Sequence, residues 1–82
     1  MEYKIEFGGR TYDARHGGPF DRGSADSYYG RPKDPHFYVG KTGDGEPIIP
    51  TETSDAYWEY MAGYDYNEIY GDKKNYGGGR YD

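Results

Sequence analysis

The sequence predicts an α+β fold in which two helices pack through glycines, with a short N-terminal β-hairpin and a Pro/Gly-rich connecting arm. Three observations predict it: an alternating apolar pattern near the N-terminus, two stretches bounded by helix start and stop signals, and a glycine inside each stretch. We expect residues 1–76 to form a single small domain and residues 77–82 to be a flexible Gly-rich tail.

Aromatic side chains are the candidate core. The 82 residues contain no Leu, but they contain twelve Tyr, three Phe and one Trp. So small an aliphatic share is typical of disordered chains, yet each buried ring removes roughly 150–250 Å² from water. We therefore expect a folded domain with a core of rings, near the size at which stability becomes thin. Such a core leaves little room for an enclosed catalytic pocket.

The N-terminal residues 1–13 are predicted to form the hairpin. Tyr3, Ile5 and Phe7 alternate with charged residues, which is typical of a half-buried strand. The pair Gly8-Gly9 follows at once, and it suits a tight turn that needs positive φ angles. A second strand is therefore expected to return directly along the first.

The first helix is predicted over residues 19–29. Pro19 suits the first helical position, and Gly30 shortly before another proline signals the end. The arm, residues 32–50, contains too many prolines and glycines for a long helix. Its apolar stretches at 37–39 and 48–49 either close a second small hairpin around the turn-rich residues 40–45 or belong to a bare loop.

The second helix is predicted over residues 54–70, with Thr51 or Thr53 as its N-cap and Gly71 just past its C-terminus. A glycine inside a helix costs about 1 kcal/mol relative to alanine. Gly63 is therefore expected to pack tightly against a neighbour, and its expected partner is Gly23 in the first helix.

Negative charge is concentrated on the second helix. The chain has 10 Lys and Arg against 15 Asp and Glu, which gives a net charge of -5. This charge disfavours non-specific electrostatic binding to nucleic-acid phosphates. Residues 51–70 contain five carboxylates and no Lys or Arg, and they include the only Trp, a residue type enriched at interfaces. This acidic helix is interpreted as a surface that binds a partner, and the alternative is that its charges only confer solubility. The candidate partner-binding residues are Glu52, Asp55, Trp58, Glu59, Asp65 and Glu68.

A second candidate surface combines basic and aromatic residues. Rings beside cations are typical of a stacking platform with phosphate contacts, as in single-stranded nucleic-acid binding. The competing interpretation is that these rings are simply the core. The candidate nucleic-acid-binding residues are Arg22, Arg31, Lys33, Tyr28, Tyr29 and Phe37.

The sequence contains no strong catalytic, metal or cofactor motif. It has no Cys, and His16 and His36 lack metal-ligand spacing. Gly40-Lys41-Thr42 resembles the end of a phosphate-binding loop, but Pro35 stands where that motif requires glycine. We expect no enzyme and no cofactor, since a catalytic role would require His36 and a carboxylate to converge in a cleft.

The order of the motifs at 20–31, 35–38, 62–68 and 71–74 resembles a group of small uncharacterised proteins encoded by tailed bacteriophages, cyanophages among them. More distantly, the pattern is similar to the ribosome modulation factor family, small basic two-helix proteins that bind ribosomes. This chain departs from that family in its negative charge. The residues that carry the second resemblance are Gly23, Ala25, Pro35, Trp58, Gly63 and Tyr64.

These resemblances imply a viral protein: a non-enzymatic phage accessory protein that binds and modulates a host macromolecule. We expect that macromolecule to be a host protein bound through the acidic helix, and the alternative is the ribosome or RNA. A homodimer is also compatible, because a small core leaves aromatic surface exposed. No run approaches the ~20 apolar residues of a membrane span. We therefore expect no membrane partner and a location in the cytoplasm of an infected bacterial host.

Overall fold

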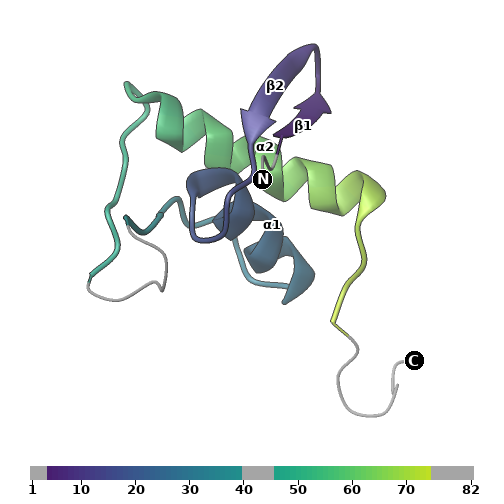
Figure 1. The fold of residues 1–82 in the computed structure, drawn as a ribbon. Helices are drawn as coiled ribbons and strands as arrows, with labels where there is room; N and C mark the ends of the chain where they lie inside the picture. Colours follow the sequence, from purple (N-terminus) through teal and green to yellow (C-terminus); the bar gives the residue numbers. More distant parts are fainter. Residues whose placement is uncertain (1–3, 40–45, 75–82) are drawn as a thin grey trace.

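The computed structural model describes residues 4–39 and 46–74 of the chain. Its elements are β1 (Lys4–Phe7), β2 (Arg10–Asp13), α1 (Pro19–Tyr28) and α2 (Asp55–Tyr70). In Figure 1 the long α2, in green, crosses the molecule with the purple hairpin above it and α1 below it. The predicted α+β fold is confirmed. The predictions for residues 1–3, for the turn at 40–45 and for the tail at 77–82 lie outside the described residues.

The hairpin has the predicted position and turn. Strands β1 and β2 pair antiparallel, with Ile5 opposite Tyr12 and Phe7 opposite Arg10. Gly8 and Gly9 have φ angles of 61° and 81°, the left-handed values that a tight two-residue hairpin turn requires. Because side chains alternate along a strand, these paired residues share one face, and that face packs onto α2.

Helix α1 ends one residue before the predicted boundary. Tyr29 is its C-cap, and Gly30 has a φ angle of 71°, as predicted for the residue that follows a helix. The Gly30 N–H donates to the Ser27 carbonyl at 3.0 Å, and the Arg31 N–H donates to the Asp26 carbonyl at 2.8 Å. These two bonds form a complete Schellman motif, which turns the chain sharply away from the helix.

Helix α2 is capped differently from the prediction. Ser54 is the N-cap, so the assignment to Thr51 or Thr53 is wrong. The hydroxyls of those two threonines bond each other at 2.8 Å in the preceding turn. Gly71 follows the last helical residue, as predicted, and its backbone is extended, with a φ angle of -95°.

The segment after α2 returns to the end of α1. The Lys74 N–H donates to the Tyr28 carbonyl at 2.7 Å, and the Lys73 ammonium donates to the Ser27 carbonyl at 3.0 Å. Extended backbone at Gly71 directs the chain toward these carbonyls, whereas a left-handed residue would have turned it back along α2.

The two helices cross at Gly23 and Gly63, as predicted. A Cβ atom built on Gly23 would lie 2.0 Å from the Tyr60 carbonyl oxygen, and one on Gly63 would lie 2.0 Å from the Phe20 carbonyl oxygen. The two backbones therefore touch, and a side chain at either position would require the helices to move apart. Around the crossing, Tyr60 and Phe20 are almost completely buried, at 0% and 1% exposure.

Aromatic rings connect the three elements into one core. The Tyr12 and Phe20 ring centroids lie 5.2 Å apart, and Phe20 and Tyr66 lie 5.6 Å apart. Phe7 meets Tyr66 edge to face at 5.5 Å, so the hairpin, α1 and α2 share one aromatic cluster. Within the described ranges, no helix is long and apolar enough to cross a membrane.

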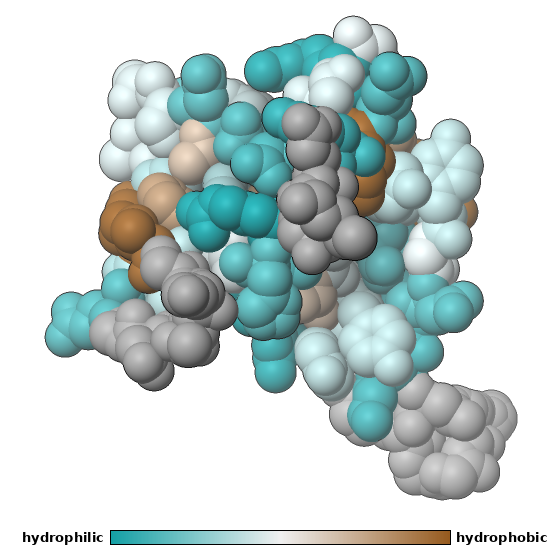
Figure 2. All heavy atoms as spheres, in the orientation of Figure 1, coloured by the Kyte–Doolittle hydropathy of each residue, from teal (hydrophilic) through white to brown (hydrophobic). Residues whose placement is uncertain are grey.

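The arm contains a minimal strand pairing. Phe37 and Ile48 form one isolated antiparallel bridge, with N–H to carbonyl distances of 3.1 and 2.8 Å in the two directions. This favours the second hairpin over the bare loop. Val39, Ile48 and Ile49 remain exposed on the arm, and Figure 2 shows apolar surface in brown at that side of the molecule.

Candidate functional site

The five carboxylates of the predicted acidic surface divide into two groups. Asp65 and Glu68 belong to the first group, because both form ion pairs within the fold. An Asp65 oxygen lies 3.2 Å from the Lys33 ammonium, and Glu68 pairs with Lys73 while accepting the Ser27 hydroxyl at 2.7 Å. The Lys73 and Ser27 hydrogen bonds lower the pKa of the Glu68 carboxyl. These two carboxylates therefore hold α2 to its neighbours.

The second group is an acidic patch, Glu52, Asp55 and Glu59, at the beginning of α2. None of its three carboxylates forms an ion pair with another residue in 4–39 or 46–74. Partial burial raises the pKa of the Glu59 carboxyl, the Asp55 charge raises it further, and the charges of Arg10 and Arg15 oppose the shift. Glu59 is thus a partly buried carboxylate whose charged form is disfavoured by burial and by the neighbouring Asp55.

Trp58 lies beside the acidic patch in a fixed orientation. Its indole N–H donates to the Glu52 carbonyl at 2.8 Å, and its ring meets Tyr57 at 4.8 Å, yet half of the side chain is exposed. The ring also forms one wall of a groove of about 460 Å³ between the hairpin and α2. The apolar residues that line the groove are Phe7, Tyr12, Trp58, Met61 and Ala62.

The three cations of the predicted nucleic-acid surface all face carboxylates. Arg22 lies 3.5 Å from Asp21, Arg31 lies 3.3 Å from Asp26, and Lys33 is the partner of Asp65. Their positive charge is therefore largely neutralised within the fold.

The aromatic members of that surface are only partly gathered. The Arg31 guanidinium lies 4.8 Å from the Tyr29 ring, and Tyr28 meets Tyr29 edge to face at 4.9 Å. Lys33 instead lies over the Tyr64 ring of α2, and Phe37 is held in the arm by its bridge. Arg31, Tyr28 and Tyr29 thus form one cluster at the end of α1.

A buried polar network, which no sequence pattern predicted, joins α1, α2 and the arm. Asp26 is only 4% exposed and accepts a hydrogen bond from the Tyr60 hydroxyl, which itself accepts the Asp34 N–H at 3.0 Å. Burial and the bond to Asp26 raise the pKa of the Tyr60 hydroxyl. Because Asp26 and Tyr60 are 34 residues apart in the chain, no local pattern signals the pair.

His36 and a carboxylate do converge in a cleft, which is the arrangement that a catalytic role would require. The His36 Nδ1 atom lies 3.9 Å from Asp26 and 2.7 Å from the Asp34 carbonyl oxygen. A carbonyl only accepts, so Nδ1 carries a proton and Nε2 of the neutral ring is an acceptor. Asp26, however, is already bonded to Tyr60 and Arg31. The cleft, of about 320 Å³, is lined by Arg22, Asp26, Arg31, Pro32, Asp34, His36 and Tyr38.

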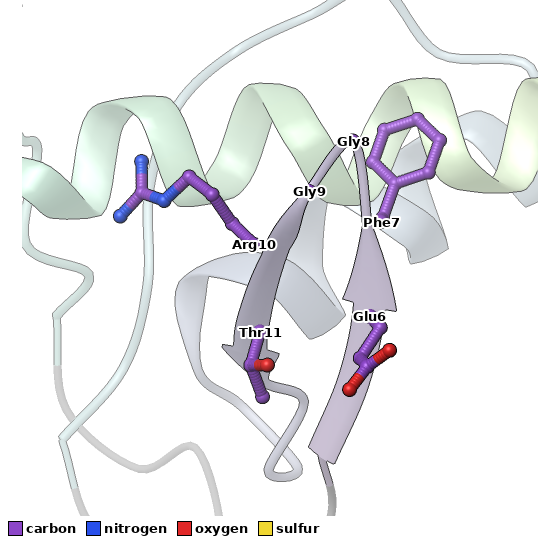
Figure 3. Close-up of a pocket in the computed structure, with 6 residues that line it drawn as sticks. All are labelled: Glu6, Phe7, Gly8, Gly9, Arg10 and Thr11. Carbon is purple, nitrogen blue, oxygen red and sulfur yellow. The ribbon is translucent and has the colours of Figure 1, made fainter.

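Two further features offer little chemistry. A hollow of about 380 Å³ lies at the hairpin turn, and its two charged side chains, Glu6 and Arg10, point in different directions in Figure 3. Among the residues that the structure places, no group of three or more His, Asp or Glu side chains could hold a metal ion.

No family model, no curated protein and no solved structure matches this chain.

Proposed function

We propose that this protein is a non-enzymatic accessory protein of the phage-encoded kind, which binds a basic surface of a host protein in the cytoplasm of the infected cell. The acidic patch and Trp58 form the binding surface. The observation that carries the proposal is that Glu52, Asp55 and Glu59, beside a half-exposed tryptophan, form no ion pair with any residue that the structure describes, whereas Asp65 and Glu68 are ion-paired. A basic partner would neutralise these three charges.

The orientation of Trp58 supports a role as an interface anchor. Tryptophan is among the residues that most often dominate binding energy, especially where it fills or borders a pocket. The bond from its indole N–H to the Glu52 carbonyl fixes the ring before binding, which reduces the entropy lost on association. The same bond ties the ring to the backbone of Glu52, the first residue of the acidic patch.

The raised pKa of Glu59 also supports binding. Burial and the neighbouring Asp55 disfavour the charged form, so the carboxylate at neutral pH costs stability. Functional sites often carry such a cost in stability. Pairing with a cation of the partner would offset the cost at Glu59, which forms no ion pair with another described residue.

The test is capture from host lysate with two variants of equal charge. The first variant carries Glu52→Gln, Asp55→Asn and Glu59→Gln. The control carries Glu6→Gln, Glu46→Gln and Asp72→Asn, three exposed positions outside the acidic patch. We expect the first variant to lose the captured host protein and the control to retain it, as identified by mass spectrometry. Equal capture by the two variants would show that the acidic patch does not bind the partner.

Binding to the ribosome or RNA is the second candidate function. The cluster of Arg31, Tyr28 and Tyr29 favours it, since a cation on an aromatic face is a common way to hold unpaired bases. This function predicts co-sedimentation with ribosomal particles that weakens steeply with salt and is lost with Arg31→Ala. Absence of co-sedimentation at low salt would exclude it.

A further inference from the structure

We propose that the cleft between α1 and the arm binds a small zwitterion, such as a free amino acid, with the carboxylate of the ligand on Arg22 and its ammonium group on Asp34. The cleft, of about 320 Å³, is lined by Arg22 and Asp26 of α1 and by residues of the following segment, among them Asp34 and His36. That volume is at the lower end of the range for ligand pockets, so it suits a molecule of amino-acid size.

Arg22 has a hydrogen-bond donor that the fold does not use. Its side chain is only 26% exposed and its Nε atom is buried, yet this nitrogen donates to no acceptor among the described residues. An Asp21 carboxylate oxygen lies 3.5 Å away, but this oxygen accepts the Gly17 N–H at 2.9 Å instead. Because a buried donor without a partner is costly, an unsatisfied arginine that lines a cleft indicates a bound ligand or an ordered water.

A carboxylate is the ligand group that best matches Arg22. A guanidinium and a carboxylate form two parallel hydrogen bonds in a fixed plane. A phosphate monoester fits the same donors, but it carries a charge of about -1.5 to -2 at neutral pH. The cleft is lined by two cations, Arg22 and Arg31, and by two carboxylates, Asp26 and Asp34. These charges balance, so a ligand of zero net charge keeps the balance, whereas a phosphate would be repelled.

Asp34 and His36 supply acceptors for the ammonium group of the ligand. The Asp34 carboxylate forms no ion pair with another residue that the structure describes. The Asp26 carboxylate, by contrast, is already bound by Tyr60 and Arg31. The backbone of Asp34 is fixed at both ends, because its N–H donates to the Tyr60 hydroxyl and its carbonyl accepts from His36 Nδ1. Nε2 of the neutral His36 ring is therefore a second acceptor.

The cleft is separate from the surface proposed to bind a host protein. Neither the acidic patch nor Trp58 is among the residues that line it. Binding of a zwitterion therefore does not rest on the proposed function, and it is measured with the purified chain and no partner.

The experiment is an NMR titration of the isotope-labelled chain with glycine at constant ionic strength, followed at the Arg22 Nε–H resonance. We expect a saturating shift with a dissociation constant of about 1–10 mM, as befits so small a ligand. Acetate carries only the carboxylate and methylammonium only the ammonium group, so each should bind about tenfold more weakly.

Two outcomes of the titration would overturn the proposal. The absence of a saturable shift up to about 100 mM glycine would show that the Arg22 Nε–H donates to an ordered water only. Binding of acetate as tight as that of glycine would show that the cleft does not recognise the ammonium group.

Substitutions test the two roles separately. Arg22→Gln should abolish the shifts that glycine causes in the backbone resonances of the cleft, whereas Arg10→Gln, at an exposed site on the hairpin, should leave them unchanged. Asp34→Asn should weaken glycine binding about tenfold without weakening acetate binding, because it removes a charged acceptor but keeps the backbone N–H bound to Tyr60. Asp72→Asn, at an exposed site outside the cleft, is the matched control. Wild-type affinity of Asp34→Asn for glycine would contradict the assignment of the ammonium group to Asp34.

Discussion

Substituting Gly63 by alanine tests the contact on which the fold depends most. The new Cβ atom would lie 2.0 Å from the Phe20 carbonyl oxygen and 2.8 Å from the Phe20 carbonyl carbon. Both atoms are backbone, so no side chain can rotate away to make room. The helices must separate by about 1 Å to bring the Cβ–oxygen distance to 3.0 Å, below which Cβ contacts in proteins essentially never occur.

The cost of that separation can be worked from the buried rings. Phe20 and Tyr60 each bury roughly 150–250 Å², worth about 4–6 kcal/mol per ring at about 25 cal/mol per Å². A gap approaching 1 Å forfeits at least a quarter of the contact energy, which is about 2–3 kcal/mol for the two rings. Alanine returns about 1 kcal/mol through its higher helix propensity. The net loss is about 1–2 kcal/mol, which lowers Tm by about 4–16 °C for a domain of this size.

The assay is urea unfolding followed by Trp58 fluorescence and circular dichroism, with thermal melts in parallel. We expect a lower midpoint with an unchanged slope, because the fold is retained. The double variant Gly23→Ala with Gly63→Ala should lose less than the sum of the two single losses, since one separation of the helices accommodates both Cβ atoms.

Gly30→Ala is the matched control. Its φ angle of 71° makes alanine costly, by about 1–2 kcal/mol, but no atom lies within 4 Å of the new Cβ. Its loss should therefore add to that of Gly63→Ala. Unchanged or higher stability of Gly63→Ala would refute the backbone contact, because the propensity gain would then be the only effect.

Three further predictions concern titratable groups. Tyr60→Phe should cost about 1.5–3 kcal/mol by leaving the Asp26 carboxylate and the Asp34 N–H without their partner, whereas Tyr57→Phe should cost little. The pKa of Tyr60 is raised in the folded state, so its contribution to stability is present below the unfolded pKa of about 10 and is lost as pH rises above that value. The Tyr60→Phe variant should therefore not show this loss of stability at alkaline pH. The lowered pKa of Glu68 means that its contribution is present above about pH 4.5 and lost on acidification, so Glu68→Gln should flatten the decline of stability between about pH 5 and 3. The raised pKa of Glu59 has the opposite effect, because its charged form lowers stability. Glu59→Gln should therefore raise Tm at pH 7 and leave Tm unchanged below about pH 4. A lower Tm of this variant at pH 7 would contradict the unfavourable environment of the Glu59 carboxylate.

Local signals in the sequence predicted the elements well. The glycine pair, Pro19 and Gly30 act on their own backbone and immediate neighbours, so they mark the turn and the bounds of α1 to within one residue. The crossing at Gly23 and Gly63 was also predictable, because an interior glycine weakens a helix unless a second backbone comes close to it. The N-cap of α2 was not predictable, because the three hydroxyl residues at 51, 53 and 54 can each fill that position.

The candidate site depended on contacts that no local pattern contains. The acidic run predicts one continuous surface, but the crossing of the helices brings Lys33 to Asp65, and the return of the chain after α2 brings Lys73 to Glu68. Asp26 has the sequence context of a solvated helix residue, and it is buried where Tyr60 of α2, Arg31 and His36 meet it. Ion pairing and burial here follow from tertiary geometry, which the one-dimensional pattern does not encode.

The return of the chain to the end of α1 makes the two helices one cooperative unit. The last turn of a helix ordinarily frays, because its carbonyls lack partners. Here the carbonyl of Ser27 is bound by Lys73, 46 residues later in the chain, and that of Tyr28 by Lys74. Opening the end of α1 therefore requires releasing the segment that follows α2, so local fluctuations of the first helix are suppressed until both helices open together.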